Sequence, residues 1–112
     1  MKALLVKVGS AKAEQVETDG KLESLQKLVG GSIEYLPLPC GAHAYIDEEG
    51  KLKGKPMNSL ATHLLCKEWN IGLGAGDFIV GDLVILGDDG KGDEADAPAE
   101  LIEQTKALGF LA

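Results

Sequence analysis

The sequence predicts an α+β fold with a mainly antiparallel sheet and about three helices, in a single small domain that spans residues 1–112. Short apolar runs bounded by Gly and Pro are typical of strands. Longer segments with apolar residues on one helical face are typical of amphipathic helices. At 112 residues, 45% of them hydrophobic, the chain can bury one core but is too short for two.

The first third of the chain predicts three strands. Residues 2–8 (KALLVKV) form an apolar run that is closed by Gly9, which fits a buried strand. Residues 11–19 alternate loosely and fit an exposed strand. Residues 32–38 (SIEYLPL) alternate again, and Pro37 and Pro39 either stop this strand or confine it to a sheet edge, because proline cannot donate a ladder hydrogen bond.

The middle and the last third predict two further β features and a loop. Two short runs flank Glu48-Glu49-Gly50 and predict a β-hairpin whose tight loop uses a positive φ at the glycine. Residues 78–86 (FIVGDLVIL) predict one strand with a bulge or bend at its internal Gly-Asp pair. The acidic residues 87–98 (GDDGKGDEADAP) predict a solvated loop.

Helices are predicted at about residues 21–29, 58–68 and 98–108. The leucines of the first helix share one face, and Gly30 supplies the left-handed residue that ends it. Pro98 fits the first turn of the last helix, because its missing N–H group would have no partner there.

The charge of the chain is unusual. The sequence has 18 acidic and 11 basic residues, so its net charge is −7, and every basic residue is a lysine. Residues 1–76 balance nine acids with nine lysines, so the whole net charge lies in residues 77–112. Phosphates would repel such a chain, so we expect no direct DNA or RNA binding. The acidic segment is a candidate for binding a basic protein surface through Asp88, Asp89, Asp93, Glu94 and Asp96.

The sequence predicts a cytoplasmic protein that makes no contact with a membrane. No run reaches the roughly 18 apolar residues of a membrane helix, and Lys7 interrupts the apolar start before a signal-peptide core can form. Cys40 and Cys66 lie far apart and form no CxxC pair. We therefore expect buried or half-buried free thiols, rather than a disulfide or a zinc site.

The templates for catalysis and for metal binding fit this sequence poorly. Either cysteine would need His43 or His63 as its base, and the spacing matches no familiar mechanism. The simpler interpretation is one half-buried imidazole in a strand and another on a helix face. His43 with Asp47, Glu48 and Glu49 lacks the spacing of a zinc site or of an EF-hand loop. We therefore expect no catalysis, no metal and no cofactor.

An anion-binding segment is a better candidate. The glycine-rich residues 72–77 run into a strand, so they lack the helix N-terminus that a P-loop needs. In residues 53–63, two lysines precede a predicted helix whose first amides carry partial positive charge. The alternative is that Asn58 only caps the helix and that the lysines are solvated. The candidate ligand-binding residues are Lys53, Lys55, Pro56, Asn58, Ser59 and His63.

Three motifs carry a resemblance to a known family and lie in segments that cover more than half of the chain. They are LxxLQxxVGG in residues 22–31, G-x-P-x-N at Gly54, Pro56 and Asn58, and I-x-G-D at Ile79, Gly81 and Asp82. In this order and spacing they resemble the bacterial and phage family called domain of unknown function 3846. Family members commonly have Arg where this chain has Ser59.

The resemblance implies a setting on phages, plasmids or integrated elements in a bacterial host cell, and it implies no known reaction. We therefore expect a non-catalytic accessory protein of a phage or mobile element, for instance in counter-defence, that captures a small anionic, nucleotide-like signalling molecule. The alternative is an acidic inhibitor that binds a host protein through its C-terminal third by nucleic-acid mimicry. A third possibility is a fold module with no independent activity. Because so short a chain gains core area by pairing, we also expect a homodimer or a higher homo-oligomer.

Overall fold

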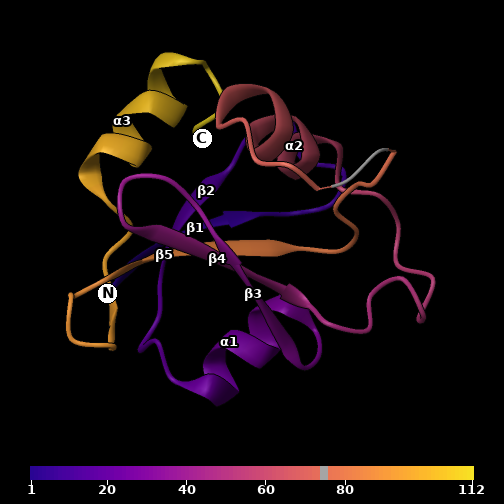
Figure 1. Ribbon diagram of the computed structural model, residues 1–112, viewed down its shortest axis with the longest axis horizontal. Coiled ribbons are helices and arrows are strands. Elements are labelled where there is room, and N and C mark those ends of the chain that lie inside the picture. Colours follow the sequence, from indigo (N-terminus) through magenta and orange to yellow (C-terminus); the bar gives the residue numbers. More distant parts are fainter. Residues whose placement is uncertain (74–75) are drawn as a thin grey trace.

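The computed structural model describes residues 1–73 and 76–112 (Figure 1). Within these residues, pairs of strands alternate with helices along the chain. The elements are β1 (Lys2–Val6), β2 (Glu14–Glu17), α1 (Leu22–Val29), β3 (Ile33–Pro37), β4 (Ala42–Asp47), α2 (Ser59–His63), the π-helical turn η1 (Leu64–Glu68), β5 (Leu83–Asp88), β6 (Glu94–Ala95) and α3 (Ala99–Ala107). The α+β prediction is confirmed, because the sheet is antiparallel throughout the described residues and the three predicted helices are present.

The sheet separates two helical layers. Its strand order is β2-β1-β5-β4-β3, and the short β6 pairs with the end of β5. Helix α1 covers one face of the sheet, whereas α2 and α3 lie on the other face (Figure 1). Strand β3 is an edge strand, as Pro37 predicted, and β2 forms the opposite edge.

Strand alternation divides the apolar residues between two cores. In β5, Leu83 and Ile85 pack toward α2 and α3, whereas Val84 and Leu86 pack toward α1. All four side chains are fully buried. A strand that is covered on both faces has a continuous apolar sequence, which is why LVIL carries no polar residue. Burial of each such side chain contributes about 1.5–3 kcal/mol, so the central strands stabilise both layers at once.

The prediction of a hairpin around Glu48-Glu49-Gly50 is wrong. Strand β4 ends at Asp47, and the chain turns through residues 48–54 without a second strand. The hairpin instead joins β3 to β4, with Cys40 and Gly41 at φ 64° and 76° in its loop. The physical reason is burial, because β4 brings apolar side chains to both cores, whereas the lysine-rich KLKGK segment has almost nothing to bury.

The structure confirms one further sequence prediction and corrects two others. The bend in residues 78–86 is confirmed, since Gly81 has φ 74° and the regular strand begins only at Leu83. The acidic residues 87–98 are not wholly a solvated loop, because they contain β6. Both cysteines are free thiols, but Cys40 is exposed rather than buried.

None of the helices within residues 1–73 and 76–112 is long and apolar enough to cross a membrane.

The buried side chain of Asn58 joins three segments. Its Oδ1 accepts a hydrogen bond from the Ala61 amide at 3.0 Å, which confirms the predicted helix cap. Its Nδ2 donates to the carbonyls of Val6 and Gly81, both at 2.9 Å. The side chain is completely buried. Asn58 therefore connects β1, the start of α2 and the bend before β5.

Replacement of Asn58 should be costly because it removes the cap and leaves two buried carbonyls without partners. We expect Asn58→Ala to lower the free energy of unfolding by about 2–4 kcal/mol. The control is the exposed neighbour Ser59, and Ser59→Ala should change the free energy of unfolding by less than about 0.5 kcal/mol. Urea unfolding measures both values. Equal effects of the two substitutions would contradict this role of Asn58.

Candidate ligand-binding site

Two lysines of the predicted anion site bind a buried carboxylate instead. The ammonium groups of Lys53 and Lys55 lie 2.8 and 2.7 Å from Oδ2 of Asp47. Asp47 itself is only 2% exposed. Lys55 also donates to the carbonyl of Val29 at 2.8 Å, at the C-terminal end of α1, where a cation interacts favourably with the helix dipole. We call these three charged residues the Asp47–lysine cluster.

The Gly30-Gly31 pair makes room for this cluster. A Cβ atom on Gly30 would lie 2.9 Å from Nζ of Lys55, and one on Gly31 would lie 2.6 Å from both Asp47 Oδ1 and Lys53 Nζ. These separations are shorter than any normal contact. The lysine ends could move aside, but the buried Asp47 carboxylate could not easily do so, so the close approach favours glycine at position 31 in particular.

The three motifs of the sequence meet at this part of the molecule. The end of α1 carries the Gly30-Gly31 pair, which contacts Lys53 and Lys55. The amide of Gly81 donates to the carbonyl of Pro56 at 2.9 Å, and the amide of Asn58 donates to the carbonyl of Ile79 at 2.8 Å. The structure therefore assigns the motif residues a shared architectural role, the docking of residues 53–58 and 79–82 against α1 and α2.

The remaining predicted ligand residues do not converge with the two lysines. Pro56 and Ser59 are exposed, and Asn58 is buried. His63 is also exposed, with its Nε2 at 3.4 Å from Glu68 and its ring at 5.4 Å from that of Phe110. An anion at this segment would have to compete with Asp47 for both lysines.

The Asp47–lysine cluster should make stability depend on acid. Burial alone raises the pKa of Asp47, but hydrogen bonds from Lys53, Lys55 and the Glu49 amide outweigh it and hold this pKa well below its usual value. The stabilisation is therefore present above the unfolded-state pKa of about 4 and is lost as the pH falls toward the folded-state value. We expect the free energy of unfolding of Asp47→Asn to fall less steeply than that of wild type between about pH 5 and pH 2.

Urea unfolding across this range is the measurement, and Asp93→Asn, at an exposed carboxylate, is the control. Lys53→Met, which leaves Lys55 in place, should flatten the profile in the same direction if Asp47→Asn folds too poorly to measure. Equal slopes for wild type, Asp47→Asn and Lys53→Met would show that the cluster contributes nothing to acid stability.

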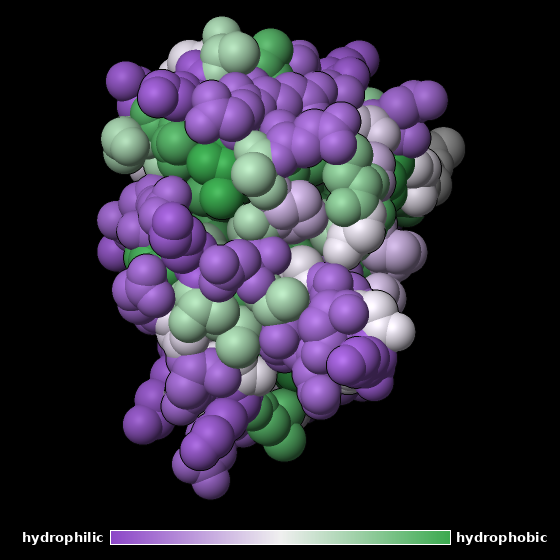
Figure 2. Space-filling model, turned by 90° about the vertical axis from the view of Figure 1, so that its left-hand side faces the viewer, coloured by the Kyte–Doolittle hydropathy of each residue, from purple (hydrophilic) through white to green (hydrophobic). Residues whose placement is uncertain are grey.

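The acidic segment of the C-terminal third is shaped by its own carboxylates. Asp88 accepts from the Gly90 amide, and Asp89 accepts from the amides of Lys91 and Asp93. Asp96 accepts from the Lys2 amide at 2.7 Å. The face of the molecule that carries this segment is mostly hydrophilic, with small separated hydrophobic patches (Figure 2). Several predicted partner-binding acids are thus engaged in forming the loop itself.

Glu94 connects this acidic segment to an aromatic cluster in the sheet. Its carboxylate lies 2.6 Å from Nε2 of His43 and accepts from the Tyr45 hydroxyl at 2.8 Å. His43 is 3% exposed and stacks on Tyr35 with ring centroids 5.1 Å apart. Desolvation and the Glu94 carboxylate raise the pKa of Tyr45.

This cluster is not apparent from the sequence. His43 and Tyr45 are two residues apart in β4 and so share one face of the strand, which was the available signal, but Glu94 comes from a segment predicted as a solvated loop. The cluster does not include an activated thiol. The pKa of the Cys40 thiol is raised by desolvation and by Glu100, so the thiol is held in its neutral form.

Loss of the Glu94 carboxylate should loosen the acidic segment. We expect Glu94→Ala to lower the free energy of unfolding by about 1–3 kcal/mol, because His43 and Tyr45 lose a charged partner. Amide hydrogen exchange of residues 88–96 should become faster. Asp93→Ala is the matched control and should change stability by less than about 0.5 kcal/mol. Unchanged amide exchange in Glu94→Ala would show that the contacts of Glu94 with His43 and Tyr45 do not hold the acidic segment in place.

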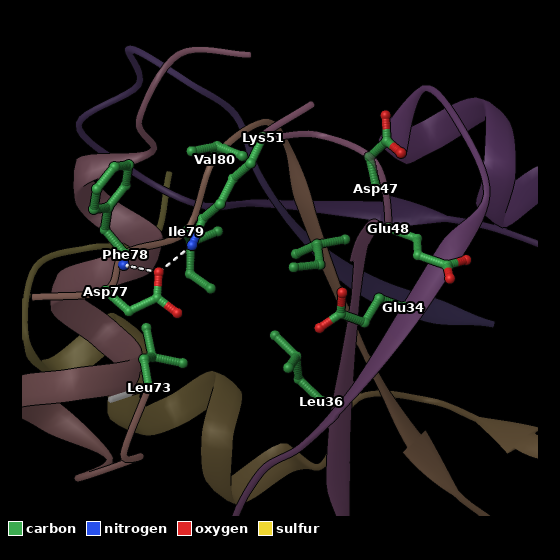
Figure 3. Close-up of a pocket in the computed structure, with 11 residues that line it drawn as sticks. Glu34, Leu36, Asp47, Glu48, Lys51, Leu73, Asp77, Phe78, Ile79 and Val80 are labelled. Carbon is green, nitrogen blue, oxygen red and sulfur yellow. Dashed lines mark hydrogen bonds and ion pairs between the residues drawn. The ribbon is translucent and has the colours of Figure 1, made fainter. Parts of the chain in front are cut away.

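A small cavity lies between the β3–β4 hairpin and residues 77–80 (Figure 3). Its volume is about 140 Å³. Its walls combine apolar and charged side chains in similar measure, and its lining residues are Glu34, Leu36, Ile46, Asp47, Glu48, Lys51, Leu73, Asp77, Phe78, Ile79 and Val80. The sequence analysis did not predict this cavity, because its walls come from three segments that are distant in the chain.

The charges in the cavity are predominantly negative. Glu34 and Asp77 point toward one another from opposite walls, whereas Asp47 and Glu48 point away from the space between them (Figure 3). Lys51 reaches in from the rim and binds Asp77. Hydrogen bonds from Lys51 and from the Phe78 amide lower the pKa of Asp77. A positively charged group therefore suits this cavity, and an anion does not.

Within residues 1–73 and 76–112, no group of three or more His, Cys, Asp or Glu side chains is arranged to hold a metal ion.

Fold and cavity together define a small antiparallel α+β domain with helices on both faces of its sheet and an acid-lined pocket beside its edge hairpin. The family described as Domain of unknown function (DUF3846) matches residues 1–108, and the chain belongs to this family. The resemblance carried by the three motifs is thereby confirmed. No curated protein and no solved structure matches the chain.

Proposed function

We propose that this protein is a non-catalytic binding protein whose pocket takes a positively charged group on a short apolar stem. One observation carries the proposal, namely that Glu34 and Asp77 face each other across a cavity whose walls include apolar side chains. Carboxylates attract a cation, and the walls around them favour the apolar part of the same ligand. The setting in a phage or mobile element, which the family resemblance suggested, belongs to this proposal as well.

The size of the cavity limits the ligand. At about 140 Å³ it is close to the roughly 150 Å³ of an engineered protein cavity that binds benzene. Pockets for drug-sized molecules usually measure about 300–1,000 Å³. A group the size of one side chain fits, and a whole nucleotide does not. The expected capture of an anionic, nucleotide-like molecule therefore gains no support from this pocket.

The lining favours binding over turnover. Its described residues include no Ser, Thr, Cys or His that could act as an activated nucleophile. The His43–Glu94 pair lies on the other face of the sheet from the pocket residue Ile46, because His43 and Ile46 are three residues apart in β4 and their side chains point to opposite faces.

A second candidate function is the binding of a basic protein by the acidic segment. The observation in its favour is that Asp88, Asp89 and Glu94 hold the segment in one conformation through their own hydrogen bonds. Fixed carboxylates cost less ordering entropy on binding than mobile ones. The expected homo-oligomer would be compatible with either function and stays a prediction.

Titration with simple cations tests the first proposal. We expect n-butylammonium and n-butylguanidinium to shift the amide NMR signals of pocket residues, while n-butanol and butyrate leave them unchanged. Glu34→Gln and Asp77→Asn should each weaken binding about tenfold, since each removes a charged partner. Binding should also weaken with added salt.

The control for net charge is Glu103→Gln, which removes the same charge from an exposed position on α3. It should leave the affinity unchanged. Shifts spread evenly over the surface, or equal losses in Glu103→Gln and Asp77→Asn, would mean that the cations bind nonspecifically and would contradict the proposal.

A further inference from the structure

We infer that Lys51 is a tethered occupant of the pocket, whose ammonium holds the position beside Asp77 that the charged group of a ligand takes on binding. This inference rests on the proposed function and adds its regulation and the chemical class of its ligand. The ligand class is a primary alkylammonium, because the occupant already present is an ammonium on a stem of four methylene groups.

The geometry of Lys51 supports the inference. Its ammonium binds the carboxylate of Asp77 and lies 5.3 Å from the centroid of the Phe78 ring. Both partners line the cavity. The ammonium is thus held by a carboxylate and by an aromatic face, which are two groups that commonly recognise cationic ligands.

The three lysines of residues 51–55 differ in a way that singles out Lys51. Lys53 and Lys55 bind Asp47, whose side chain is fully buried, so loss of both would leave an unpaired charge in the interior. Lys51 and Asp77 have side chains that are 54% and 41% exposed. An exposed ion pair is weak, and water can replace either partner. Lys51 is therefore the lysine that a ligand can displace.

The position of Lys51 in the chain also allows it to move. It lies in the turn of residues 48–54, after the last residue of β4, and not in a strand or helix. Its neighbour Leu52 is 89% exposed and holds nothing in place. Displacement of the Lys51 side chain from Asp77 therefore requires no change in the sheet.

Removal of this occupant should tighten binding. We expect Lys51→Met, which keeps an unbranched apolar stem and removes the ammonium, to bind n-butylammonium roughly two- to fivefold more tightly than wild type, the range that an exposed ion pair supplies. Lys91→Met is the matched control, because it changes the net charge equally at an exposed position in the acidic segment. It should leave the affinity unchanged.

A direct measurement separates displacement from a general charge effect. When n-butylammonium saturates the wild-type protein, the side-chain Hε signal of Lys51 should move to its position in the Asp77→Asn variant, where the ion pair is absent. An unchanged Lys51 signal during saturable binding would overturn the inference. So would weaker binding by Lys51→Met, which would make Lys51 part of the site.

The affinities of two probes distinguish a protein-borne alkylammonium from a free one. The peptide N-acetyl-Gly-Lys-Gly-amide presents a lysyl side chain, and n-butylammonium presents the same group on a free molecule. Tighter binding of the peptide would support a lysine of another protein chain as the ligand, and tighter binding of n-butylammonium would support a free amine. Failure of both probes with wild type and with Lys51→Met would refute the proposed function itself. Binding that is lost in Asp77→Asn but is not tightened in Lys51→Met would refute only the role of Lys51.

Discussion

The arrangement of this molecule depends on the hydrogen bonds of one buried amide side chain. Asn58 caps α2 and at the same time binds carbonyls of β1 and of the bend before β5. Thr62, one turn later, accepts from the amide of Ile79 at 3.0 Å. Together these bonds hold residues 79–81 against α2, and this segment forms one wall of the pocket. The buried interior and the pocket are therefore positioned by the same helix start.

The charges of the protein separate into two groups according to what binds them. In the first group, Asp47 is bound by Lys53 and Lys55, which are near it in sequence, and Glu94 is bound by His43 and Tyr45, which are distant in sequence. In the second group, Glu34 and Asp77 face a cavity whose lining holds one lysine. Buried charges are tolerated only when they are paired, so the first group has a structural role. In the second group, Asp77 is bound only by the half-exposed Lys51, and this is the pair on which the proposed binding function rests.

This division changes the meaning of the acidic composition. The net charge of −7 lies entirely in residues 77–112, and for this reason the sequence favours the acidic segment as a binding surface. In the folded protein, that segment uses many of its carboxylates to form its own turns, whereas the pocket combines Asp77 with Glu34 from the other part of the chain. Negative charge therefore gathers in both places, and only the pocket combines it with apolar walls.

The sequence by itself determined the local structure. Helix ends at Gly30 and Asn58, the edge position of the strand with Pro37, the bend at Gly81 and the fold class were all predicted, because periodicity, caps and backbone preference act over a few neighbouring residues. Only the tertiary structure decided which runs pair. It joined β3 to β4 rather than forming a hairpin at Gly50, it placed Lys53 and Lys55 on Asp47, and it brought Glu34 and Asp77 across one cavity. These outcomes depend on how much apolar surface each pairing buries and on which charges meet when distant segments pack, and neither quantity can be read from neighbouring residues.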